Sequence, residues 1–276
     1  MTMVEPGVPP DQPSAQDKLM TILAVDLKNL EASMRMLGNN APLHSALRSA
    51  HTTLEMLTSE ASAFQTATRS PWLALHFLRA TEFSWAAAVR SILMLHRAEA
   101  MSNIRVALEM LGCALVSAQL KTADVDGEPT LHSRLFDTAW VGKQLNKLEP
   151  TPTLKALKDR KLMCSSFGAH GNLYQLAGRL KNERCEQSGT TQRLCCDFSY
   201  ADLQPTQIPA MLAWLVGVAA GAALLFRDDL CAAAHCSSTP AFHASFAELD
   251  RHAKLLSARY PLPTQEQWSG DSDQCS

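Results

Sequence analysis

The chain has 276 residues, of which 46% are hydrophobic and 19% are charged, a composition typical of a soluble globular protein with a sizeable core. Its formal net charge of -2, without any long run of Lys or Arg, gives no overall electrostatic reason to expect polyanion binding. The Pro-rich, acidic N-terminus lacks the basic start and apolar stretch of a secretory signal, and eight irregularly spaced cysteines favour a reducing compartment. We therefore expect a cytoplasmic protein.

Apolar residues recur with a helical period along most of the chain, and this periodicity predicts about seven helices. One region, residues 72–120, is too long for a single helix in a compact domain, because it would span on the order of 70 Å. We expect it to break near residues 78–81 or near Ala98. The predicted helices cover residues 14–38, 42–68, 72–120, 131–148, 153–180, 208–226 and 240–260.

The remaining segments are expected to be loops or tails. Residues 1–13 are polar and Pro-rich and cannot bury enough apolar surface to order the backbone, and the polar stretch 261–276 is expected to behave in the same way. The region after residue 182 is expected to be irregular up to Pro205, with a possible short hairpin around Ser188-Gly189. The sequence thus predicts an all-α bundle that forms a single domain over residues 14–260.

The segment from Ile208 to Phe226 contains no charge and is close to the length that spans a membrane. Trp214 and the Gly217-x-x-x-Gly221 spacing, which lets helices approach closely, agree with a span. Its richness in Ala and Gly, and the acidic residues that directly follow Arg227, favour a central buried helix instead. We expect the buried helix, and keep a single-span membrane-anchored protein as an alternative.

Arg105 and Glu109 form a charged pair in the otherwise apolar stretch 100–120. Four residues apart on a helix, they share one face. Since Arg before Glu is the less favourable order for the helix dipole, helix stability alone explains the pair poorly. The pair is therefore predicted to be either a buried structural tie or part of a site.

His170 is the histidine with the most open setting, because it lies between two glycines and follows hydroxyl residues at 165 and 166. The run LMLHRAEAMSNIRVALEMLGCALV, followed by SSFGAHG, resembles a family of uncharacterised bacterial all-helical proteins. That family has an Arg-x-x-x-Glu helix and a later Ser-x-x-x-His helix, which match Arg105, Glu109, Ser166 and His170. The resemblance covers about residues 84–229 and implies that these polar residues converge in a bundle, but it carries no established activity.

A second, weaker similarity is to helical ribonucleases of prokaryotic defence and toxin systems, whose signature is Arg, four to six residues, then His. Arg90 and His96 have this spacing, although a pair of this kind is expected by chance in a chain with nine histidines. In this alternative, His96 or His170 acts as general acid or base and Arg90 or Arg105 stabilises phosphate charge without a metal.

Metal binding has weak support in Cys231, His235 and Cys236, which could form a partial zinc site with Cys195 and Cys196. The spacing matches no standard zinc finger. The sequence also lacks a phosphate loop, a dinucleotide-binding glycine pattern and a His-Glu-x-x-His motif, so we expect no cofactor.

These observations favour a non-enzymatic helical regulatory or interaction module, in which Arg105, Glu109 and His170 form a buried polar cluster that fixes helix register. The close-packing Gly217 and Gly221 surface also suggests a homodimer. The alternative is the ribonuclease, and only that alternative implies RNA as a partner.

Overall fold

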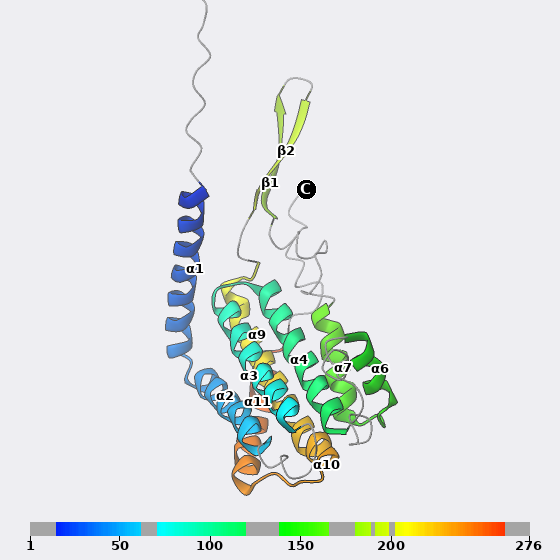
Figure 1. The fold of residues 1–276 in the computed structure, drawn as a ribbon. Coiled ribbons are helices and arrows are strands. Elements are labelled where there is room, and N and C mark those ends of the chain that lie inside the picture. Colours follow the sequence, from blue (N-terminus) through cyan, green and yellow to red (C-terminus); the bar gives the residue numbers. More distant parts are fainter. Residues whose placement is uncertain are drawn as a thin grey trace, which may run out of the picture.

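A computed structural model describes residues 15–61, 71–119, 138–165, 180–188, 191–198 and 202–262. Within these residues the chain is an all-α bundle, as predicted, accompanied by a two-stranded hairpin (Figure 1). The predicted tail 1–13 and all but two residues of 261–276 lie outside the described residues. The helices are α1 (Ala15–Gly38), α2 (Ala41–Ala61), α3 (Pro71–Leu93), α4 (Arg97–Gln119), α6 (Thr138–Lys147), α7 (Pro152–Cys164), α9 (Ile208–Leu225), α10 (Cys231–Ala233) and α11 (Pro240–Arg259).

Helix α9 lies at the centre of the bundle, where it packs against α2, α3, α7 and α11. Most of its residues are buried on all sides, which explains why it is apolar all round. The Trp85 indole N–H donates a 2.8 Å hydrogen bond to the carbonyl of Leu215 in the middle of α9. Two helical segments, Arg97–Ala118 and Pro205–Ala233, are long and apolar enough to cross a membrane, and 67% of each apolar window is buried inside the protein.

The long apolar region breaks between α3 and α4, close to the predicted position near Ala98, whereas residues 78–81 lie inside α3. Leu95 takes a left-handed conformation with φ 67°, and the amide of His96 donates to the carbonyl of Ser91 at 2.8 Å. The amide of Leu95 also donates to the carbonyl of Ile92. The two hydrogen bonds together form the Schellman motif that ends many helices. A leucine occupies the position that usually carries glycine, so the turn has no glycine signal in the sequence.

The hairpin consists of β1 (Leu180–Ser188) and β2 (Thr191–Phe198), paired antiparallel with Ser188 opposite Thr191. Its turn lies where the short hairpin was expected, but the strands are longer, so the prediction of a mainly irregular region after residue 182 was wrong. The register shifts between Lys181 and Arg184, which marks an irregularity near the base. The hairpin projects away from the helices (Figure 1).

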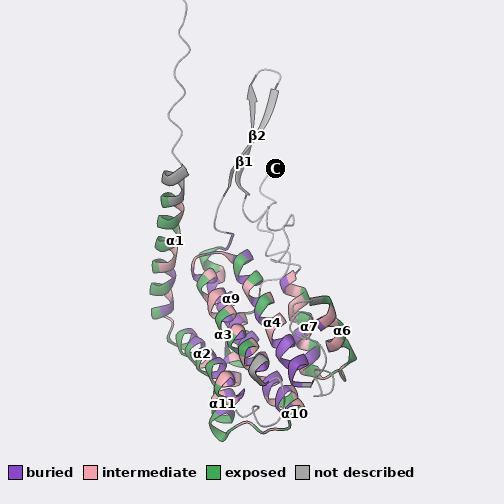
Figure 2. Ribbon diagram, in the orientation of Figure 1, coloured by how far each residue is buried: buried purple, intermediate pink, exposed green. Residues whose placement is uncertain are grey.

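Helix α1 stands beside the bundle rather than within it, and most of its surface is exposed (Figure 2). Ser33 and Leu37 near its C-terminal end are buried, whereas Met20, Leu23 and Leu27 are more than half exposed. The apolar period that predicted this helix therefore corresponds only in part to a buried face.

Candidate functional site

Arg105 and Glu109 lie on α4 and form the expected ion pair, with Arg105 Nε 3.1 Å from Glu109 Oε1. The same carboxylate oxygen lies 3.2 Å from Lys161 Nζ on α7. The side chains of Arg105 and Glu109 are 27% and 16% exposed, so the pair is half-buried rather than fully buried. Glu109 thus joins α4 to α7 through Lys161 and is also paired with Arg105 of its own helix, which is the geometry of a structural tie between helices.

Ser166 and His170, the partners expected for this pair, lie outside the described residues, which end at Ser165 just after α7. The predicted convergence of His170 on Arg105 and Glu109 stays a prediction. What the structure does place beside the pair is Cys164, whose buried thiol has its pKa raised to about 12 by burial, while the charge of Arg105 opposes this shift.

His96 follows the left-handed Leu95 and contacts α1, since its Nε2 lies 3.0 Å from Asp26 Oδ1. Arg90, its partner in the ribonuclease pattern, lies exposed near the end of α3. The shared site of Arg90 and His96 stays a prediction, while the contact that the structure gives His96 is with a carboxylate of another helix.

Next to His96, the N-terminus of α4 is capped by a residue that sequence analysis did not single out. The carboxylate of Asp202 accepts hydrogen bonds from the amides of Arg97 and Ala98, at 2.6 and 3.1 Å. Arg97 itself is buried, with 5% exposure, and desolvation lowers the pKa of its guanidinium while the charge of Asp202 opposes that shift. Because Asp202 lies 105 residues from Arg97 in the chain, no local sequence pattern predicts this cap.

Cys231 begins the short helix α10 (Cys231–Ala233), and His235 and Cys236 lie just after its end. His235 is exposed and left-handed, with φ 51°, and the amide of Cys236 donates to the carbonyl of Cys231 at 3.0 Å. Burial raises the pKa of Cys231 to about 12, and the partial zinc site stays a prediction. The side chains of Cys195 and Cys196 in β2 lie outside the described ones.

Another group of possible metal ligands was not predicted. His51, Glu55 and Glu82, from α2 and α3, have ligand atoms within 4.8 Å of one another. The side chains of His51 and Glu55 are 47% and 57% exposed, and a surface ion-pair cluster accounts for the arrangement equally well.

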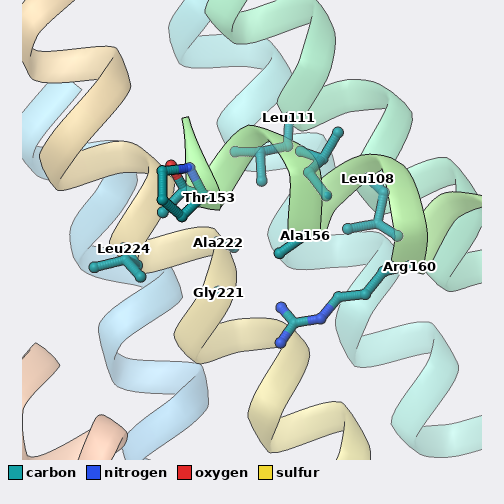
Figure 3. Close-up of a pocket in the computed structure, with 10 residues that line it drawn as sticks. Leu108, Leu111, Thr153, Ala156, Arg160, Gly221, Ala222 and Leu224 are labelled. Atoms are coloured by element: carbon teal, nitrogen blue, oxygen red, sulfur yellow. The ribbon is translucent and has the colours of Figure 1, made fainter. Parts of the chain in front are cut away.

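A cavity of about 160 Å³ lies where α4, α7 and α9 meet (Figure 3). Its walls are almost entirely apolar side chains and helix backbone. Of the described residues that line it, Arg160 is the charged one and Thr153 carries the hydroxyl. The lining residues are Leu108, Leu111, Pro152, Thr153, Ala156, Leu157, Arg160, Gly221, Ala222 and Leu224.

The two polar residues of the cavity differ in how they are satisfied. Thr153 is hydrogen-bonded to Asp229 and to Thr151. Arg160 extends from α7 towards α9 and lies over Gly221, where a β-carbon would be 3.0 Å from its Cζ and would overlap its Nη1 (Figure 3). Within the part of the chain that the structure describes, the Arg160 guanidinium has no hydrogen bond or ion pair, and desolvation lowers its pKa.

Comparison with known proteins gives no relative for this chain: no protein-family model, no curated protein and no solved structure matches it. The resemblance to an uncharacterised bacterial family therefore rests on the short motifs alone, and the functional argument rests on the geometry of the cavity and of the charged residues around it.

Proposed function

We propose that this chain is a non-enzymatic helical binding module of the cytoplasm, and that it holds a small ligand in the cavity between α4, α7 and α9. The observation that carries the proposal is the cavity itself. It is a concave, mostly apolar space that is partly open to solvent, and such preformed pockets with a few polar groups are where small ligands bind. An engineered cavity of about 150 Å³ binds benzene, so a ligand of that size fits a space of about 160 Å³.

The charged residues that first suggested a site support a structural role instead. Glu109 offsets the charges of Arg105 and Lys161, and this contact fixes α7 against α4 at the edge of the cavity. A tie of this kind holds the cavity walls in register, which a preformed binding site requires.

The ribonuclease alternative is supported by one contact, the 3.0 Å distance between His96 Nε2 and Asp26 Oδ1, because a carboxylate can orient an imidazole for proton transfer.

The membrane-anchored alternative is supported by the apolar length of Pro205–Ala233. A homodimer stays a prediction, and its sequence argument has changed, since Arg160 rather than a second helix occupies the surface of Gly221.

Methyl NMR of the full-length protein tests the proposal. Benzyl alcohol, a small neutral probe, is expected to shift the methyl signals of Leu108, Leu111 and Leu157, and Ala222→Leu, which fills the cavity, is expected to abolish these shifts. A folded wild type whose cavity methyls do not respond to any small probe contradicts the binding site. RNA cleavage by the purified protein that a folded His96→Ala or His170→Ala lacks contradicts the non-enzymatic assignment, and recovery from cells only with detergent contradicts the cytoplasmic one.

A further inference from the structure

The cavity between α4, α7 and α9 combines an apolar wall with one unsatisfied cation, and this combination specifies the chemistry of its ligand. A partly buried arginine without a partner loses part of its hydration and gains no ion pair in return, so an anion bound beside it would be favoured. The guanidinium of Arg160 is in this situation within the described residues: burial disfavours its charged form, and Gly221 leaves room for it only because glycine has no β-carbon.

The surroundings of Arg160 favour an anion over a neutral ligand. Both Arg160 and Arg105 act electrostatically on the Cys164 thiol, so the two guanidinium groups share one neighbourhood. Lys161 adds a third cation to this neighbourhood. Glu109 is a carboxylate that contacts these cations, and it is bonded to Arg105 and Lys161 rather than to Arg160. Asp229, the acidic residue bonded to the cavity, accepts from Thr153 and not from Arg160.

We propose that the cavity binds a small organic carboxylate, with Arg160 holding the carboxylate and the leucine-lined wall enclosing an apolar body about as large as a benzene ring. Arginine suits this role because its planar fork can donate two parallel hydrogen bonds to one carboxylate. The apolar body would contact Leu108, Leu111 and Leu157, while the carboxylate would supply the negative charge that Arg160 otherwise lacks. This inference rests on the proposed binding function and adds the ligand's charge and size.

Titration calorimetry with two pairs of probes tests the inference on the wild-type protein. Benzoate is compared with benzyl alcohol, and isovalerate with isoamyl alcohol, so that each pair differs in the charged group and keeps a similar apolar body. Since a hydrogen bond to a charged group contributes more than a neutral one, the carboxylate of each pair is expected to bind at least about tenfold more tightly. Equal affinity for the carboxylates and the alcohols overturns the inference and leaves the binding function intact, whereas no binding of any probe overturns both.

Substitutions then assign the preference to one residue. Arg160→Gln and Arg160→Met are each expected to remove the preference for carboxylates while retaining affinity for the alcohols, and the second variant also removes the polar group. Lys161→Gln is the matched control, because it removes the neighbouring cation of the same helix, which is bonded to Glu109. A preference that survives both Arg160 substitutions, or that Lys161→Gln removes equally, overturns the assignment to Arg160.

Discussion

Two neighbouring cations on α7 differ in their partners. Lys161 lies 3.2 Å from Glu109, which also bonds Arg105, and all three side chains remain partly in contact with water. Arg160, one residue earlier, points to α9 and lies over Gly221 without a hydrogen bond or ion pair among the described residues. The two side chains carry the same charge and share one helix.

The presence of a carboxylate partner at Lys161 and its absence at Arg160, among the residues that the structure describes, distinguish a charge with a structural role from a charge available to a ligand. A half-buried cation that shares a carboxylate contributes modestly to stability and costs little to keep. A partly buried cation without a partner loses hydration and gains no ion pair, and perturbed groups of this kind beside a cavity are typical of functional sites. Arg97 is a third case, since it is buried but lies beside the carboxylate of Asp202.

Removal of that carboxylate should have the largest effect, because it caps the first turn of α4 and places a negative charge close to the buried Arg97. Asp202→Ala removes the acceptor for the amides of Arg97 and Ala98 at the start of α4. We expect a loss of about 2 kcal/mol in the free energy of unfolding, since hydrogen bonds to a charged group contribute about 1.5–3 kcal/mol and N-terminal caps up to about 2 kcal/mol. Urea denaturation followed by circular dichroism measures this loss.

Asp228→Ala provides the control for this prediction. Asp228 is an exposed carboxylate whose ion pair is with the adjacent Arg227, at 2.6 Å. Its removal should change the free energy of unfolding by less than about 1 kcal/mol. If both variants lose the same small amount of stability, the cap that Asp202 provides for α4 does not stabilise the protein.

Glu109→Gln should have a smaller effect, because the charges it leaves on Arg105 and Lys161 can still be solvated. We expect a loss of about 1 kcal/mol, between the values for exposed and buried pairs. A double-mutant cycle with Lys161→Met measures how much of this loss is the contact between α4 and α7. The tie would be discounted if the coupling energy of the cycle were zero within error.

The arrangement of the helices could be predicted from the sequence because burial imposes a period on it. The apolar length of α9 predicted a central helix. The repeat over residues 72–120 predicted a break near residues 78–81 or near Ala98, and the second position is close to the observed one. The exact turn was beyond prediction, since Leu95 takes a conformation that glycine usually marks. The strands of the hairpin were underestimated because their residues are largely polar and carry little apolar alternation.

The candidate site was predictable only in part. Arg105 and Glu109 were evident because charges interrupt an apolar helix, but their partner Lys161 is far away in the sequence. Arg160 was missed because a charged residue in the stretch KDRK has the pattern of an exposed helix face. The one available signal was Gly221, where the glycine does allow a close approach, although a side chain rather than another helix makes it.

Gly217 and Gly221 offer the sharpest test of the comparison, because one helix carries both glycines and Arg160 covers one of them. Around Gly217 nothing lies within 4 Å of an added β-carbon, so Gly217→Ala should raise the free energy of unfolding by about 0.5–1 kcal/mol through helix propensity. Gly221→Ala gains the same propensity but displaces the flexible end of Arg160 from its position. The free energy of unfolding of Gly221→Ala should therefore change less than that of Gly217→Ala, while the preference of Gly221→Ala for benzoate over benzyl alcohol is lost.

Urea denaturation measures the stability of the two variants, and calorimetry measures their affinities for the two probes. If Gly221→Ala keeps the full preference for benzoate, the position of Arg160 over α9 does not determine ligand choice, and the difference between Arg160 and Lys161 has no functional meaning.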